Sequence, residues 1–265
     1  MGICKDPSLT FLNRFGYNVV RLPRAGIEPM LVLGKAQSLE MLGKLSAVWK
    51  TSLPEPSVGA PQTVADLNGK QSDKLELSVG LKILANALQG LGASVPSLDF
   101  AFSRARKVQF TYTNATSTSV NPLDAGNYLA SGDLFSANPI VQSYFLGDQG
   151  HAFLIVDVLK SDTLTVSATA ENGSDVKLDV PAIQGVLGAS LGVKSGNASD
   201  SVIQFQGKTP ITFGFKAFAI SFEGGRWNLR GAKPGQDLAF AFDPSGEAED
   251  ETEGILFTTS GLVGL

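Results

Sequence analysis

Residues 163–180, TLTVSATAENGSDVKLDV, contain the clearest pattern in the chain. In the first half of this stretch apolar residues alternate with threonine and serine, and in the second half they alternate with charged residues. A period of two is typical of a strand with one apolar and one polar face. The Asn172-Gly173 pair between the halves favours a tight turn. The stretch therefore predicts a β-hairpin with an apolar face made of Leu164, Val166, Ala168, Ala170, Val176, Leu178 and Val180.

The same alternation occurs in residues 74–79 and 108–113, on either side of a segment with helical spacing. The apolar positions of these two predicted strands are Leu75, Leu77, Val108, Phe110 and Tyr112. Between them, apolar residues from 79 to 91 recur every three or four positions, which predicts a helix. Residues 203–206 and 211–216 also alternate. The patterns predict an α+β chain built on a half-buried antiparallel sheet.

Two further regions are predicted to connect these elements. Residues 51–73 are rich in Pro, Gly, Ser and Gln and are interpreted as a loop. Residues 114–139 are interpreted as a second loop-like region, with a short helix near 124–134.

Alternation of this kind fits two classes of protein. A sheet with one solvated face has it, and so does a membrane barrel, whose strands face water on one side and lipid on the other. Barrel strands need about 9–11 residues to cross a bilayer. The alternating runs have 6–8 residues, so periodicity alone leaves both classes open.

The charge of the chain is concentrated near its C-terminus. The net charge is −4, but residues 243–265 hold six acidic residues and no Lys or Arg, so the remainder carries +2. We divide the chain into a body (1–242), an acidic linker (243–254, DPSGEAEDETEG) and an apolar peptide (255–265, ILFTTSGLVGL). The linker is expected to be exposed and open to proteolysis. The alternative is an ordinary solvated tail.

The apolar peptide is expected to dock back onto the body. The side chains available for this contact are Ile255, Leu256, Phe257, Leu262, Val263 and Leu265. The predicted region of proteolytic cleavage is marked by Asp243, Gly246, Asp250 and Gly254.

The composition excludes several functions. One Cys and one His exclude an intramolecular disulfide and most metal sites built from nitrogen and sulfur ligands. His151 beside a serine is the remaining possibility for a hydrolase, but no G-x-S-x-G motif supports it, and a structural histidine is the simpler interpretation. A pI near 5.1 disfavours nucleic acid as a partner. We therefore expect that the chain is not an enzyme and that it binds neither a metal ion nor a nucleic acid.

The chain is also expected to be made in the cytoplasm. Its N-terminus lacks the basic and apolar regions of a secretory signal, and no apolar run reaches the roughly 18 residues of a spanning helix. Cys4 lies close to this end, ahead of Leu9, Phe11, Leu12 and Phe15. A cysteine there is either an incidental thiol or a site of S-acylation, which supplies weak membrane affinity.

Taken together, three stretches resemble the bacterial gasdermins. They are MGICKDPSLTFLNRFGYNVVRLPRAGIEPMLVLGK (1–35), which includes Cys4, then SDKLELSVGLKILANALQGLG (72–92), and the apolar tail after its acidic linker. The resemblance covers essentially the whole chain. It implies a twisted central antiparallel sheet with flanking helices, similar to the pore-forming domain of animal gasdermins, followed by a short autoinhibitory C-terminal peptide.

The resemblance also implies a function. Cys4 would be self-palmitoylated, with no other cofactor, and the autoinhibited protein would be a cytoplasmic monomer. A protease would remove the C-terminal peptide, after which the body would insert hairpins into membrane lipid, form a homo-oligomeric pore in the inner membrane and kill the infected cell in antiphage defence. The alternative is a soluble, non-enzymatic lipid- or protein-binding module with a disordered tail.

Overall fold

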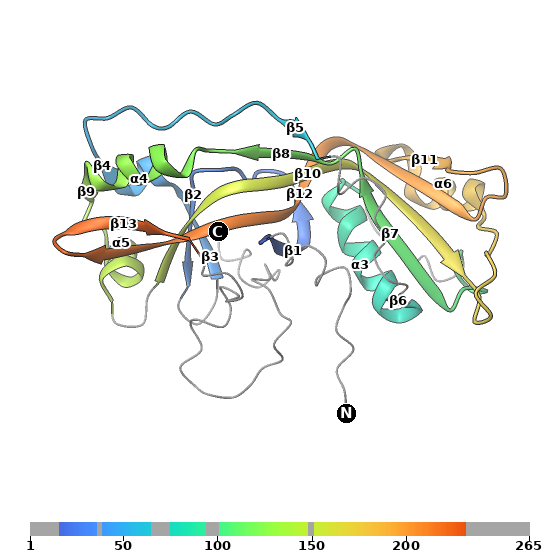
Figure 1. The fold of residues 1–265 in the computed structure, drawn as a ribbon. Helices are drawn as coiled ribbons and strands as arrows, with labels where there is room; N and C mark the ends of the chain where they lie inside the picture. The colour runs from blue at the N-terminus through green and yellow to red at the C-terminus, as the bar shows by residue number, and fades with distance from the viewer. Residues whose placement is uncertain (1–15, 36–38, 65–74, 94–100, 148–150, 232–265) are drawn as a thin grey trace.

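The computed structural model describes residues 16–35, 39–64, 75–93, 101–147 and 151–231. Its centre is a pair of long antiparallel strands, β10 (His151–Thr169) and β12 (Val202–Glu223). These two strands run along the length of the molecule, and the remaining elements are arranged around them (Figure 1).

Each long strand is flanked by three shorter strands that follow one another along its outer edge. The neighbours of β10 are β2 (Leu31–Lys35), β8 (Thr116–Ser119) and β7 (Lys107–Thr113). The neighbours of β12 are β13 (Arg226–Arg230), β1 (Asn18–Arg24) and β11 (Gly192–Ser195). Outside β2, β8 and β7 lie β3 (Leu39–Lys44), β5 (Gln62–Thr63) and β6 (Leu75–Glu76). In the described residues these eleven strands form one sheet, in which every pairing is antiparallel.

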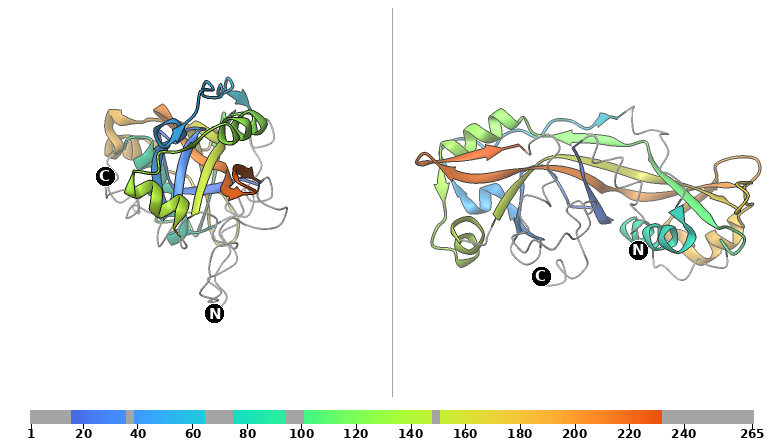
Figure 2. Two further views of the ribbon diagram at one scale, coloured as in Figure 1. Left: turned by 90° about the vertical axis from the view of Figure 1, so that its left-hand side faces the viewer. Right: turned by 60° about the horizontal axis from the view of Figure 1, so that its bottom comes forward.

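The helices gather at the two ends of the sheet (Figures 1 and 2). At one end lie α3 (Leu77–Gly90) and α6 (Val180–Leu187), the latter followed by a 3-10 turn (Gly188–Ser190). At the other end lie α4 (Pro122–Ala130), α5 (Pro139–Val141) and a π-helical turn (Gln142–Leu146). The same end holds the short α2 (Leu45–Val48) and the two-stranded pair of β4 (Trp49–Lys50) and β9 (Asp133–Leu134).

The first half of β10 is buried on both faces. Ala152, Leu154 and Val156 pack into one apolar cluster, and Phe153 and Ile155 pack into another on the opposite side. A strand covered on both sides needs a continuous apolar run, which is what residues 152–156 provide. The second half of β10 alternates, because only one of its faces is covered by apolar side chains.

The α+β class, the large antiparallel sheet and most of the predicted elements are confirmed. Residues 108–113, 163–169, 203–206 and 211–216 lie in strands, and the helical pattern forms α3. The second loop-like region contains the predicted short helix as α4, and it also contributes β8, whose serine and threonine residues gave no apolar alternation.

The predicted second strand of the hairpin is wrong. Only an isolated bridge between Thr169 and Asp175 joins the two halves of 163–180, and α6 begins at Val180. The Asp179 side chain accepts a hydrogen bond from the Ala182 N–H and caps this helix, while Pro181 has no N–H to offer a strand partner. Residues 163–169, the first half of this stretch, pair instead with β7 and β12.

The predicted strand over 74–79 is also largely wrong. Only Leu75 and Glu76 pair with a strand, and Leu77 already begins α3. Apolar residues at 75, 77 and 79 satisfy the strand pattern, but 79 also belongs to the helical pattern, which continues over more residues and prevails. Cys4, the acidic linker 243–254 and the apolar peptide 255–265 lie outside the described residues.

Candidate functional site

The candidate site is the end of the sheet that carries α3 and α6. We define the distal module as the described residues within 75–113 and 163–206, and the proximal half as the remaining described residues. The distal module contains β6, β7, β11 and the facing ends of β10 and β12. It holds most of the alternating segments that the sequence indicates, within 75–79, 108–113, 163–180 and 203–206.

The strand register aligns the apolar residues of the module across three strands. Leu164 is opposite Tyr112 of β7 and Phe205 of β12. Val166 is opposite Phe110 and Ile203 in the same way. Because directly paired residues of antiparallel strands point to the same side of a sheet, one face of the module is apolar across its width.

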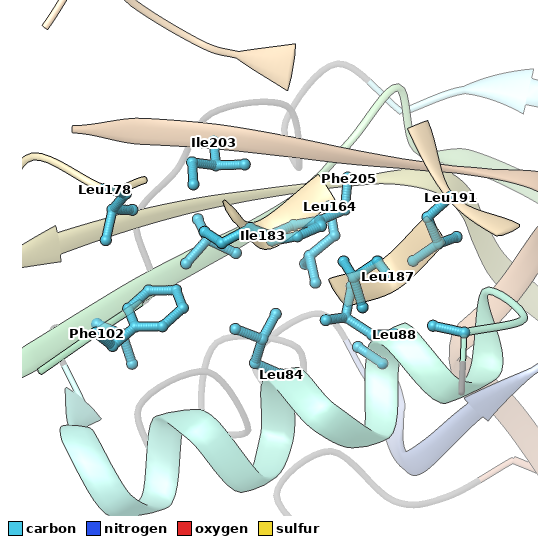
Figure 3. Packing of buried hydrophobic residues seen from close by; sticks show 14 of the residues in the cluster. Leu84, Leu88, Phe102, Leu164, Leu178, Ile183, Leu187, Leu191, Ile203 and Phe205 are labelled. Carbon is cyan, nitrogen blue, oxygen red and sulfur yellow. The ribbon is translucent and has the colours of Figure 1, made fainter. Parts of the chain in front are cut away.

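The two helices cover this apolar face. Leu84 and Leu88 of α3 and Ile183 and Leu187 of α6 point towards the strands, and Phe102 fills the space beside them (Figure 3). All of these side chains are buried. Burying one such side chain stabilises a fold by roughly 1.5–3 kcal/mol, so lifting the helices from the strands is strongly unfavourable in water.

The opposite face of the module is polar. Thr111 is opposite Thr165, Gln109 is opposite Ser167, and all four side chains are half-buried. The hydroxyl oxygens of Thr113 and Thr165 lie 3.4 Å apart. The apolar and polar faces are thus separated by the thickness of one sheet.

The structure brings most of the predicted apolar residues together. Val108, Leu164, Val166, Ala168, Val176 and Leu178 are buried in one cluster, and Tyr112, Ala170 and Val180 pack against it. Phe110 lies in β7, Leu75 lies in β6 and Leu77 begins α3. Thus Val176, Leu178 and Val180 reach the cluster from a loop and a helix rather than from a strand.

Sequence reasoning missed the contribution of α6 to this site. Ile183 and Leu187 are four residues apart, so they share one face of a helix. The available signal was the cap sequence Asp179-Val180-Pro181, which is typical of a helix start. This helix start was overlooked because the alternation of the residues before it continues to Val180 and is typical of a strand.

The described residues give no support for a metal site or a spanning helix. They contain no group of three or more His, Cys, Asp or Glu side chains placed to hold a metal ion. None of the helices described is both long and apolar enough to cross a membrane. His151 begins β10 opposite Lys35 of β2, and burial, with a further contribution from the charge of Lys35, lowers its pKa.

The sequence profile of the Bacterial Gasdermin Family matches residues 20–232, which include the whole distal module. This chain belongs to the bacterial gasdermin family. It is 36% identical over 267 aligned residues to the gasdermin bGSDM of Vitiosangium sp., with 100% of this chain and 99% of that protein covered. It is 34% identical to the gasdermin bGSDM of Lysobacter enzymogenes over 258 residues, covering 94% of this chain and 93% of that protein.

The fold agrees with this assignment. The solved structure of a bacterial gasdermin from Bradyrhizobium tropiciagri superimposes on this gasdermin with a TM-score of 0.66, covering 86% of this chain and 92% of that chain. The two sequences are 18% identical, so the likeness speaks to the fold alone. The predicted family and fold are thereby confirmed.

Proposed function

We propose that this gasdermin is a latent pore-forming protein whose distal module enters the membrane when the C-terminal peptide is removed. The observation that carries the proposal is the register of β7, β10 and β12, which puts the apolar residues on one face and the polar residues on the other. The wall of a membrane pore needs this arrangement, with lipid against one face and water against the other. Opening such a pore requires no catalytic step.

Within the distal module of the latent protein, the paired segments of the strands are too short for this task. The ladder between β7 and β10 pairs seven residues of each strand, whereas a tilted strand needs about 9–11 residues to cross a bilayer. The missing length is available in α3 and α6, which continue directly from β6 and from the segment after β10. Insertion would therefore convert these helices into strand and expose the apolar face that they cover.

Insertion also requires several copies of the chain. A strand edge exposed to lipid leaves backbone N–H and C=O groups without hydrogen-bond partners, which costs several kcal/mol for each group. The outer edges of the inserted hairpins would be paired with those of neighbouring protomers. The active state would therefore be a homo-oligomer, whereas the latent state would be a monomer.

We further propose that residues 255–265 hold the protein latent and that a protease cuts within 243–254. A peptide tethered to the body rebinds at a high effective concentration and diffuses away once the tether is cut. Removing the six acidic residues of 243–265 also leaves the body with a net charge of +2, which favours contact with anionic lipid. The freed body would leave the cytoplasm for the inner membrane and kill the cell in antiphage defence.

Palmitoylation of Cys4 would add to this membrane affinity. A single acyl chain gives weak, reversible binding that needs a second signal, and the basic body supplies one. Intact-mass spectrometry of the full-length chain from bacteria should show an added palmitoyl group that is absent from Cys4→Ala. An unmodified thiol, together with unchanged toxicity of Cys4→Ala, would refute the modification.

Dye release from vesicles tests the proposed function as a whole. The chain truncated after residue 242 should release dye from vesicles made of bacterial inner-membrane lipid, and the full-length chain should not. Expression of the truncated chain should also kill a bacterial host. A truncated chain that stays monomeric, leaves the vesicles intact and is harmless to cells would instead favour a non-enzymatic binding module with a disordered tail.

A further inference from the structure

The ladder between the two long strands is interrupted near its middle. Ser161 of β10 pairs with Ile211 of β12, and Thr163 pairs with Gln206. One residue, Asp162, therefore lies opposite four residues of β12, which are Gly207, Lys208, Thr209 and Pro210. Residues 208–210 are exposed, and Pro210 has no N–H to donate across the ladder.

The shorter strands that pair with β10 and β12 also change at the position of this interruption. Along β10, β7 ends at Thr113 opposite Thr163, and β8 begins opposite Lys160. The link between β7 and β8 contains Asn114 with a φ of 54°, a left-handed conformation that takes it out of the strand. Along β12, the pairing with β11 stops at Gln206, opposite Gly192, and the pairing with β1 starts at Thr212, opposite Arg24. The interruption therefore crosses the whole sheet, and we call it the transverse break.

The apolar cores follow the same division. The cluster beneath α3 and α6 contains one buried residue from beyond the break, Ile211. All the buried members of the three other clusters lie in the proximal half. Each half of the sheet thus has apolar packing of its own, which is the condition for opening as a separate cooperative unit.

α3 lies beside β1, and several side-chain contacts connect the two halves at the break itself. The Ser161 hydroxyl lies 2.5 Å from the carbonyl oxygen of Thr113 and 2.9 Å from that of Thr163, and it accepts the N–H of Thr163 at 3.0 Å. Tyr112 of the distal module stacks on Phe213 of the proximal half, with ring centroids 4.2 Å apart and planes 6° apart. At Gly207 a Cβ atom would lie 2.7 Å from Cδ2 of Leu91, so the residues after α3 pack directly on the break.

We propose that the transverse break is a hinge, about which the distal module opens as one unit while the proximal half keeps its structure. The Ser161 hydroxyl and the stack of Tyr112 on Phe213 hold the hinge closed in the latent protein. The use of this hinge in membrane insertion rests on the function proposed above. Separate opening of the two halves of the sheet is a property of the latent chain, and it can be measured without a membrane.

Hydrogen exchange of the full-length latent chain tests the hinge. Amides of 107–113, 163–169 and 203–206 should exchange together, at a rate distinctly faster than amides of 152–160 and 212–220. Ser161→Ala removes the bonds made by the hydroxyl and should speed exchange of the distal group by roughly tenfold, since one to two hydrogen bonds contribute about 1.4 kcal/mol. Exchange of the proximal group should change less than about twofold.

Ser167→Ala is the matched control, because Ser167 lies on the same strand but on the polar face away from the break. It should leave both groups unchanged. If both groups exchange at one rate in the wild-type chain, or if Ser161→Ala speeds both equally, the sheet is a single unit and the hinge is refuted. The wild-type pattern keeps this test decisive even where a variant does not fold. Dye release by the truncated chain reports separately on pore formation.

Discussion

The hydroxyl of Tyr17 donates a 2.6 Å hydrogen bond to Oδ2 of Asp157, across 140 residues of sequence. Ser117 donates a second bond, of 2.7 Å, to Oδ1 of the same carboxylate, and Lys216 places its Nζ 4.2 Å from the centre of the Tyr17 ring. Burial, followed by the bond to Asp157, raises the pKa of Tyr17. These contacts hold Tyr17, the residue before β1, against β10 in the centre of the sheet.

We expect Tyr17→Phe to loosen this attachment. Losing a hydrogen bond to a charged group should lower the free energy of unfolding by about 1–3 kcal/mol, measured by chemical denaturation of the full-length chain. Hydrogen exchange in β1 should accelerate. Tyr144→Phe is the matched control, because Tyr144 donates a 2.8 Å bond to Glu40 at a different edge of the sheet. Equal exchange of β1 in both variants would contradict an anchoring role for Tyr17.

Gly185→Ala should stabilise α6 and delay activation. A Cβ at Gly185 meets no atom within 4 Å, so alanine should stabilise the helix by roughly 0.5–1 kcal/mol. If α6 must unfold for insertion, dye release after truncation should slow. Gly126→Ala in α4 is the control, because a Cβ there also meets no atom within 4 Å, but α4 lies outside the distal module. Equal slowing by both variants would argue against a special role of α6.

Val166→Thr should reduce the extent of dye release by the truncated chain. Val166 is fully buried on the apolar face of the module, and a hydroxyl there should cost about 1–3 kcal/mol in the latent protein. The same hydroxyl would face lipid in the pore. Val156→Thr makes the same change in the proximal half, where Val156 is also buried. It should destabilise the latent chain similarly but leave the extent of release unchanged, and an equal loss would contradict the assignment of the distal face to lipid.

The stability of the latent chain should fall slightly below neutral pH. Burial, and next the charge of Lys35, lowers the pKa of His151 in the folded protein, so the unfolded chain takes up the proton first as the pH falls through about 6.5. The loss should be small, because His151 is only partly buried. His151→Gln should remove this component when denaturation midpoints at pH 7.5 and 5.5 are compared. An unchanged difference between the two midpoints would assign the pH dependence to other groups.

Local patterns were sufficient to predict the fold class and the strands with one covered face. Leu164 and Val166 alternate with threonine and serine because only one side of that part of β10 is covered by apolar side chains. The same reasoning failed for Val176 and Leu178, which are also apolar and buried but lie in a loop before α6. Alternation reports burial, and it does not distinguish a strand from a segment that reaches the core in another way.

It also could not be predicted from the sequence that two of the alternating runs are parts of one strand. Residues 203–206 and 211–216 are parts of β12, although Lys208, Thr209 and Pro210 between them interrupt the apolar pattern. The interruption is bridged because β10 continues past it and supplies partners on both sides. The bond between Tyr17 and Asp157 depends in the same way on the tertiary arrangement, and neither residue belongs to a recognisable motif.

In the proposed pore, the apolar face of the distal module meets lipid and its polar face meets water. A genetically encoded fluorescent amino acid, placed singly at positions 164 to 168 of the truncated chain, measures this directly on vesicles. A quencher carried on the lipid acyl chains should reduce the emission at 164, 166 and 168 and leave the emission at 165 and 167 unchanged, because only the first three positions would face lipid. Quenching that is uniform along β10, or that is absent while dye escapes, would contradict this assignment of the two faces.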